Sequence, residues 1–189
     1  MIVATNNKGK LEEIKKIFKD YKLYSLKDKG INIEVAEDGN TFLENAKKKA
    51  KYIYDLTHEE VIADDSGLCI NCLDGFPGVN THRFLGDNAS DLDRNEYLIK
   101  EVNKYNDRSC RFVCVIVYFN GIDFIVGEGV INGFIAKEMR GTNGFGFDPI
   151  FELDNGKTLA ELSSLEKNKI SARYLALMNL KRKIDKYEI

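Results

Sequence analysis

Residues 111–136 read RFVCVIVYFNGIDFIVGEGVINGFIA and carry the clearest structural signal in the chain. Two runs of apolar and β-branched residues, 111–119 and 122–136, flank Asn120 and Gly121. An Asn-Gly pair between such runs is typical of a tight turn that joins two antiparallel strands. The sequence therefore predicts a β-hairpin at this place.

Strand and helix patterns alternate on both sides of the hairpin. Further strands are expected at 2–5, 23–26 and 31–35, and the segment 61–73 reads as a strand, two acids, a turn and a second strand. Helices are expected at 11–18, 41–56, 91–104 and 164–184. Stretches rich in glycine at 75–80 and 140–151 read as loops. Because strands and helices interleave, we expect an α/β fold with a central mixed sheet.

Residue spacing also predicts how individual helices begin and which face they bury. Thr41 and Glu44 form the pattern of a capping box before helix 41–56, whose lysines are expected on its solvent side. The last helical segment either runs unbroken or restarts with Ser171 as its N-cap. The apolar positions of helix 91–104 are Leu92, Leu98, Ile99 and Val102.

The composition is that of a globular domain. The chain has 189 residues, of which 43% are hydrophobic and 31% charged, and its net charge is -2. We expect a single domain over 1–189 with two lobes that the sequence does not separate. The small net charge argues against bulk nucleic-acid binding, and no apolar run approaches the length of a membrane span. No signal-like apolar stretch follows Lys8 and Lys10, so a cytoplasmic location is expected.

The four cysteines allow two interpretations. Cys69 and Cys72 form a C-x-x-C pair, and Cys110 and Cys114 are separated by three residues, so a zinc site is one interpretation. Cys69 and Cys72 fall in a predicted strand, where positions three apart point to opposite faces, and Cys110 and Cys114 fall in another, where they would share one face. We therefore expect buried, reduced thiols that pack as small apolar side chains.

Residues 5–10, TNNKGK, join a predicted strand to a predicted helix. Free backbone N–H groups and the helix dipole favour an anion at such a junction. Thr5 and Asn7 can donate side-chain hydrogen bonds to a phosphate, and Lys8 or Lys10 can supply positive charge. The loop matches neither a Walker loop nor a dinucleotide-binding glycine motif. A solvated turn is the alternative interpretation.

The motif IADDSGL places Asp64 and Asp65 side by side at the end of a predicted buried strand. Two adjacent buried carboxylates repel each other and lose hydration. A divalent cation removes that cost, and Mg²⁺ prefers carboxylate oxygens together with substrate phosphates. Three further carboxylates stand earlier in the chain, at Glu34, Glu37 and Asp38. The alternatives are an Asp that caps a turn and an acidic loop exposed to water.

Two later motifs carry aromatic and cationic residues. In GTNGFGFDPIF, the glycines allow close backbone approach, and Phe145 and Phe147 can stack on a flat ring. The alternative is a glycine-rich turn with two core phenylalanines. In EKNKISAR, Lys167 and Arg173 flank Ser171. A helix surface with scattered cations is the alternative there.

Together these features describe a site for a Mg²⁺–nucleotide complex, and the motifs resemble those of a known family. The chain is similar to the non-canonical purine NTP pyrophosphatases, the inosine triphosphate pyrophosphatase family. Six motifs follow the family order between residues 5 and 173: T-x-N-x-x-K, EDG with TFLENA, IADDSGL, GFPGVNTHRFLG, GFGFDPIF and EKNKISAR. Each motif alone is modest, whereas six in order are highly specific.

The resemblance implies hydrolysis of ITP, dITP or XTP to the monophosphate and pyrophosphate with Mg²⁺, which removes these nucleotides from the pool. It also implies an elongated two-lobed fold with a cleft, and a homodimer. The implied catalytic residues are Asp65, Glu37 and Lys10, and the implied metal ligands are Glu37, Asp65 and Asp64. The implied substrate-binding residues are Thr5, Asn6, Asn7, Lys8, Lys10, Ser66, Phe145, Gly146, Phe147, Asp148, Lys167, Ser171 and Arg173.

The chain departs from the family pattern at one position. The family usually has Ser-His-Arg where this chain reads Ser171-Ala172-Arg173, so an imidazole that contacts the base is absent. The phosphate chemistry does not depend on it. Two other functions fit the motifs less well: a Maf-like pyrophosphatase acting on pyrimidine or modified nucleotides, and a module that binds nucleotides without hydrolysis. Loss of carboxylates would indicate the latter, and Glu37, Asp64 and Asp65 are all present.

Overall fold

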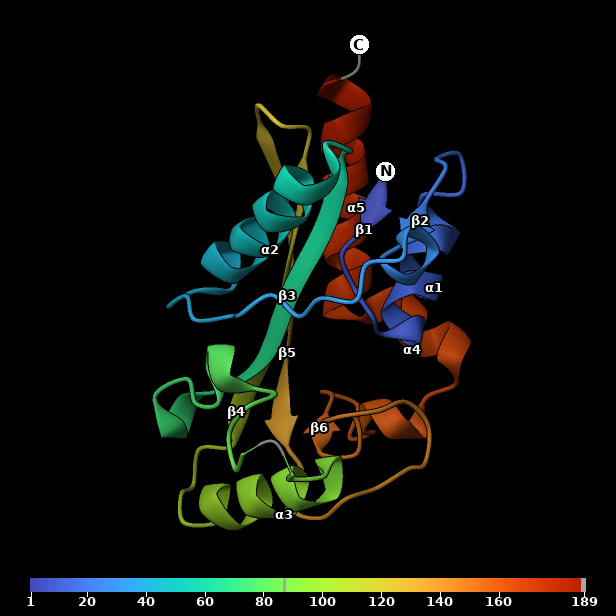
Figure 1. Cartoon of the computed structure of the whole chain (residues 1–189). Coiled ribbons are helices and arrows are strands. Elements are labelled where there is room, and N and C mark those ends of the chain that lie inside the picture. The colour runs from blue at the N-terminus through green and yellow to red at the C-terminus, as the bar shows by residue number, and fades with distance from the viewer. Residues whose placement is uncertain (87, 188–189) are drawn as a thin grey trace. The chain divides into compact units, whose positions relative to one another are not determined.

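The computed structural model describes residues 1–86 and 88–187 and has an α/β architecture (Figure 1). The helices are α1 (Lys8–Ile17), α2 (Phe42–Thr57), α3 (Asp91–Val102), α4 (Ser164–Ile170) and α5 (Ala172–Tyr187). The strands are β1 (Ile2–Val3), β2 (Tyr24–Ser25), β3 (Val61–Ile70), β4 (Ser109–Phe119), β5 (Phe124–Ile135) and β6 (Phe151–Glu152). Within these residues, no helix combines the length and the apolar character needed to span a membrane. The predicted interleaving of helices and strands is confirmed.

The strands in the described residues form one six-stranded sheet in the order β2-β1-β3-β4-β5-β6. β1 runs parallel to β2 and to β3, whereas β5 and β6 are antiparallel, so the sheet is mixed as expected. β4 and β5 are neighbours joined by a short turn, in which the Asn120 side chain accepts hydrogen bonds from the N–H groups of Ile122 and Asp123. Gly121 has φ +98°, a value that favours glycine. The predicted hairpin is confirmed.

The chain divides into two compact units. Unit 1 comprises Met1–Ser66, Cys114–Gly129 and Ala172–Ile189. Unit 2 comprises Gly67–Val113 and Val130–Ser171.

Unit 1 contains α1, α2 and α5 and has its own core. Buried apolar side chains of the core come from β1, α2, β3 and β4 and from the residues that follow β1 and β2: Ile2, Ala4, Leu26, Ala46, Ala50, Ile53, Val61, Ala63, Val117 and Phe119. The start of α5 packs closely against β5, because a Cβ at Gly129 would lie 2.1 Å from the backbone oxygen of Ala172. A side chain at position 129 would therefore push away the turn of α5 that carries Arg173.

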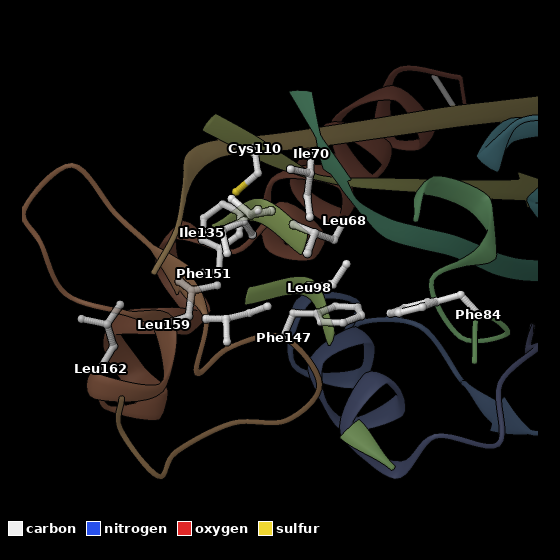
Figure 2. Close-up of a cluster of buried hydrophobic side chains, with 12 residues drawn as sticks. Leu68, Ile70, Phe84, Leu98, Cys110, Ile135, Phe147, Phe151, Leu159 and Leu162 are labelled. Atoms are coloured by element: carbon white, nitrogen blue, oxygen red, sulfur yellow. The ribbon is translucent and has the colours of Figure 1, made fainter. Parts of the chain in front are cut away.

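Unit 2 contains α3 and α4 and a second core (Figure 2). Its buried side chains are Leu68, Ile70, Phe84, Leu98, Val102, Cys110, Ile135, Phe147, Ile150, Phe151, Leu159 and Leu162. The rings of Phe84 and Phe147 stack with their centroids 6.2 Å apart and an interplanar angle of 18°, and Figure 2 shows them side by side. This core fixes the loop that contains Phe147.

The segment 61–73 differs from the prediction. It forms the single strand β3, in which Asp64 and Asp65 lie in the middle and every residue is buried. The Asp-Ser-Gly run favours a turn, but β3 is hydrogen-bonded to β4 in the sheet, whereas its pairing with β1 is limited to Val61 and Ile62. Pairing within the sheet overrides the local turn preference. The predicted second strand stops at Ile70, and Cys72 lies in the short 3₁₀ helix Asn71–Leu73.

Three further predictions need correction. Residues 31–35 form no strand. Leu92, predicted on the apolar face of α3, is 53% exposed. Thr41 caps α2 by accepting from the N–H of Glu44, but the Glu44 carboxylate accepts from Asn40 instead of Thr41, so only half of the capping box forms.

Other expectations are confirmed. Of the two alternatives for the C-terminal helical segment, the restart is observed: Ser171 has extended backbone between α4 and α5. All four cysteines lie within the described residues and are free thiols. Cys69, Cys110 and Cys114 are buried, and Cys72 is half-buried.

Candidate functional site

The loop between β1 and α1 is organised by two of the predicted phosphate ligands. The Asn7 side chain caps α1 by accepting a hydrogen bond from the N–H of Lys10 at 3.1 Å. The Thr5 hydroxyl oxygen accepts from the N–H of Asn7, also at 3.1 Å. The first turn of α1 has no acidic residue. Its free N–H groups therefore keep the partial positive charge that attracts an anion. The neighbouring Asn6 and Lys8 are exposed.

Asp64 contacts three cationic side chains of unit 1. Its Oδ2 lies 2.8 Å from Lys10 Nζ and 3.8 Å from Arg173 Nε. Its backbone oxygen accepts from Lys49 Nζ at 2.9 Å. Burial opposes ionisation of Asp64, but Lys10, Arg173 and Lys49 outweigh it and hold the pKa of this carboxyl well below its usual range. Asp64 is therefore a permanent anion that holds a set of cations in place.

Asp65 follows in the same strand and points to the other face of the sheet, because successive strand residues alternate. Its Oδ2 accepts from Asn45 Nδ2, and its Oδ1 accepts from the N–H of Ser66, both at 2.9 Å. Burial, together with the nearby Glu37 carboxylate, raises the pKa of Asp65 to about 6, although the bond from Asn45 opposes this shift. The pKa of Asp64 is thus lowered, whereas the pKa of its neighbour Asp65 is raised.

Glu37 belongs to the segment before α2 and forms an ion pair with Lys49. Burial opposes the charge on Lys49, but Asp64 and Glu37 raise its pKa above the usual value. The expectation that the α2 lysines face solvent is wrong for Lys49, whose side chain is only 15% exposed. Lys49 connects Asp64 to Glu37 and lies one helical turn after Asn45.

Sequence reasoning missed Asn45, Lys49 and Glu13. Asn45 and Lys49 are spaced four apart on α2, beside the buried Ala46 and Ala50. Polar residues bordering a face of buried alanines are the pattern that could have indicated them. Glu13 on α1 carries no such pattern.

Arg173 was expected at the base, and in unit 1 it lies between two acids. Its NH1 group lies 3.0 Å from Glu13 Oε2, and its Nε is 3.8 Å from Asp64 Oδ2. Burial opposes its charge, but Asp64 and Glu13 help to raise the pKa of the guanidinium. Its buried Nε has no hydrogen-bond partner among the described residues.

The carboxylates of unit 1 fit a metal bound with few protein ligands. Within residues 1–86 and 88–187, no group of three or more His, Cys, Asp or Glu side chains could hold a metal ion. Asp64 is engaged with two cations, Lys10 and Arg173, whereas Glu37, which pairs with Lys49, lies close enough to Asp65 to raise its pKa, so Glu37 and Asp65 are the candidate ligands. One or two carboxylates, completed by water and phosphate oxygens, are the usual ligands of Mg²⁺.

Unit 2 gathers a second set of predicted residues around Asp148. Its Oδ2 accepts from the N–H of Phe145 at 2.8 Å and forms an ion pair with Lys167. Lys167 Nζ lies 4.5 Å from the centre of the Phe145 ring. The backbone oxygen of Gly146 accepts from Asn95 at 3.0 Å. Phe145 remains 47% exposed, so its ring has a free face.

Phe147 does not join this set. Its ring is only 7% exposed and stacks on Phe84 inside the core of unit 2. The expectation that Phe147 stacks on a base is corrected, because its ring faces are enclosed by core side chains. The alternative of a core phenylalanine is right for Phe147, whereas Phe145 keeps the exposed position. Ser171, also predicted to bind substrate, lies between α4 and α5.

Comparison with known proteins gives a consistent result. The family model described as the Ham1 family matches residues 1–183. A protein of Treponema pallidum called dITP/XTP pyrophosphatase is 43% identical over 182 residues, covering 94% of this chain and 68% of its own length. One of the same name from Caldanaerobacter subterraneus is 45% identical, covering 97% and 95%. The solved Ham1 protein of Staphylococcus aureus has a TM-score of 0.91 and 38% identity, covering 100% and 98%.

Proposed function

Since the chain belongs to the Ham1 family, we propose that it is a nucleoside triphosphate pyrophosphatase that hydrolyses ITP, dITP and XTP to the monophosphate and pyrophosphate. The resemblance to inosine triphosphate pyrophosphatases, based on six sequence motifs, agrees with this family. Such an enzyme removes non-canonical purine nucleotides from the pool before they are used.

One observation carries the proposal: in unit 1, the loop that carries Lys10 belongs to one connected group with Asp64, whose pKa is lowered, and Asp65, whose pKa is raised. Lys10 bonds to Asp64, Lys49 bonds to both Asp64 and Glu37, and Asp65 is the next residue of β3. A triphosphate needs cations for its charge and carboxylates for its metal. This group offers both.

The triphosphate is bound by cations and by backbone donors. Lys10 and Lys49 supply positive charge, and the first turn of α1 supplies N–H groups that Thr5 and Asn7 hold in place. Asp64 keeps the ammonium of Lys10 in position before substrate arrives. Exposed Lys8 and Asn6 assist at the edge of the loop.

Glu37 and Asp65 would hold Mg²⁺. When bound, the metal would neutralise negative charge on the phosphate oxygens and on the departing pyrophosphate. Asp64 does not serve as a ligand in this proposal, because Lys10 and Arg173 engage its carboxylate. Two carboxylates leave coordination positions for water and for the substrate.

Asp65 would also orient the attacking water and accept its proton. Water attacks the α-phosphorus in line with the bond to the leaving pyrophosphate, so the protein mainly positions groups and balances charge. A pKa of about 6 leaves Asp65 ionised at neutral pH, and a base is most effective when its pKa lies near the working pH. No covalent intermediate is required.

The group around Asp148 would recognise the base. Phe145 offers an exposed ring for stacking, and Lys167 and Asp148 offer polar contacts at its edge. Hypoxanthine and xanthine present an acceptor at O6 and a donor at N1, whereas adenine presents the opposite polarity at both atoms. Donors fixed toward O6 would reject adenine by roughly 10⁴-fold, because they would be left unpaired.

We further propose that the protein is a homodimer in the cytoplasm, as the family resemblance implies. The free state of all four cysteines, which lie in the described part of the chain, supports a reducing compartment. Sedimentation velocity at micromolar concentration tests the dimer: a single species of monomer mass would contradict it.

A pyrophosphate-release assay tests the activity. The substrates are ITP, XTP, GTP, ATP and UTP, each with Mg²⁺ and with EDTA. We expect rapid release from ITP and XTP that requires Mg²⁺ and is lost in Asp65→Asn with the fold retained. Preference for UTP would favour a Maf-like pyrophosphatase, and binding without release would favour a nucleotide-binding module.

A further inference from the structure

Asn45 in the first turns of α2 is buried and bonded at both ends of its amide. Its side-chain oxygen accepts from the N–H of Gly39 at 2.7 Å, and its Nδ2 donates to Asp65 Oδ2 at 2.9 Å. The residue is 1% exposed. One side chain therefore connects the segment that carries Glu37 to the strand that carries Asp65.

The orientation of this amide is fixed by its two partners. A backbone N–H only donates, and an ionised carboxylate only accepts. Rotation of the Asn45 amide by 180° would place two donors against each other and two acceptors against each other. Both bonds would be lost in a buried place, where unpaired polar groups are costly.

The backbone of Gly39 packs directly against the Asn45 side chain. A Cβ at position 39 would lie 2.7 Å from Asn45 Oδ1 and 2.9 Å from Glu44 Cβ, so a side chain there would push the segment away from α2. The next N–H, that of Asn40, donates to the Glu44 carboxylate at 2.7 Å. The segment around Glu37 has no regular secondary structure, so its place against α2 depends on these bonds together with the ion pairs of Glu37 with Lys49 and of Asp38 with Lys48.

We propose that Asn45 is a positioning residue that sets the spacing between Glu37 and Asp65, so that both carboxylates can bind the same divalent cation. This inference rests on the proposed function, in which these two acids hold Mg²⁺. Asn45 touches neither substrate nor metal: it acts on one acid directly and on the other through Gly39.

Two substitutions disturb this arrangement from opposite sides. Asn45→Leu keeps a similar volume and removes both hydrogen bonds, whereas Gly39→Ala leaves Asn45 intact and displaces the segment through the clash with its amide. Lys51→Ala is the matched control, because it removes an exposed ion pair of the same helix, the one with Asp55, without touching the segment that carries Glu37. Lys51 has no part in the proposed site.

The primary measurement is Mn²⁺ binding to each purified full-length protein without nucleotide, by isothermal titration calorimetry. Loss of a residue that orients a metal ligand typically costs 10–100-fold in metal affinity or activity. We expect about this loss of Mn²⁺ affinity in Asn45→Leu and in Gly39→Ala, with a comparable fall in kcat for ITP and little change in KM. Lys51→Ala should match the wild type in every respect.

The outcomes separate the inference from the proposed function. A folded Asn45→Leu or Gly39→Ala protein with wild-type Mn²⁺ affinity overturns the inference, even if the wild type hydrolyses ITP. If Asn45→Leu does not fold, Gly39→Ala decides the question by the same titration. If the wild type binds Mn²⁺ but releases no pyrophosphate, the proposed function fails while the titration still tests the spacing of the two acids.

Discussion

Lys10 Nζ donates a 2.8 Å hydrogen bond to Asp64 Oδ2, although the two residues are 54 positions apart in the chain. A cation in the first turn of the N-terminal helix is thus held by an acid in the middle of β3. The pairing gives the buried acid a partner and fixes the ammonium before any ligand binds. A preorganised charge loses little freedom when a phosphate arrives.

Replacing Lys10 should weaken triphosphate binding more than it changes base preference. A hydrogen bond to a charged group contributes about 1.5–3 kcal/mol, so Lys10→Ala should raise KM for ITP about 10–100-fold. The ratio of kcat/KM for ITP to that for ATP should stay nearly constant. Lys16→Ala, an exposed lysine on the same helix, is the control. An unchanged KM with a uniform loss of rate on every base would contradict the phosphate role.

The raised pKa of Asp65 predicts a pH dependence of stability in metal-free protein. The pKa is about 6 in the folded chain against 3.8 ordinarily, so the folded state binds the proton more tightly. The stabilisation is complete below pH 4 and is lost as pH rises through 6, an effect of about 2–3 kcal/mol. Asp65→Asn cannot ionise and should not suffer this loss.

Urea unfolding in EDTA at pH values from 4 to 8 measures this effect. The free energy of unfolding of Asp65→Asn minus that of the wild type should increase by about 2–3 kcal/mol between pH 4 and 7. Taking this difference cancels any constant cost of the substitution. A difference that does not vary with pH would show that burial and Glu37 do not perturb Asp65.

The two phenylalanines of the loop 140–151 should respond differently to truncation. Phe147→Ala removes a ring from the core of unit 2 and should cost about 3–5 kcal/mol of unfolding free energy. Phe145→Ala removes a half-exposed ring and should cost less than about 1 kcal/mol, while lowering kcat/KM for ITP. Urea unfolding and steady-state kinetics on both variants provide the test. Equal stability losses would mean that Phe145 is also a core residue.

Gly144 and Gly146 form a matched pair that tests the position of Asp148. Both have positive φ, so alanine at either position costs about 1–2 kcal/mol in backbone strain. A Cβ at Gly144 would also lie 2.0 Å from Asp148 Oδ2, whereas nothing lies within 4 Å of one at Gly146. Gly144→Ala should therefore be more destabilising in urea unfolding than Gly146→Ala. Equal effects would show that Asp148 moves freely.

Much of the fold could be predicted because its signals are local. The turn at Asn120-Gly121 and the alternation of helices and strands depend on short stretches of sequence. The continuous strand β3 could not be predicted, because the Asp-Ser-Gly run favours a turn and pairing with β4, a strand distant in the chain, keeps it extended. Periodicity also failed for Leu92, which has helical spacing but is exposed.

The candidate site was predictable as a set of residue types and not as a set of contacts. Lys10, Glu37, Asp64 and Asp65 stand in recognisable motifs, but their bonds join segments far apart in the chain. The pKa of Asp64 is lowered by the cations that contact it, whereas the pKa of Asp65, on the other face of β3, is raised by burial and by Glu37. In the sequence, Asn45 and Lys49 are ordinary polar residues of a helix. Their partners, Gly39 for Asn45 and Asp64 for Lys49, are known only from the fold.

Hydrolysis of ITP in H₂¹⁸O tests the central claim most directly, because it identifies the phosphorus that water attacks. Attack at the α-phosphorus, with Asp65 as the base, places the label in the monophosphate and leaves the pyrophosphate unlabelled. Mass spectrometry of both products from the Mg²⁺-loaded wild-type protein should give this result. Label in the pyrophosphate, or release of inorganic phosphate, would contradict the account.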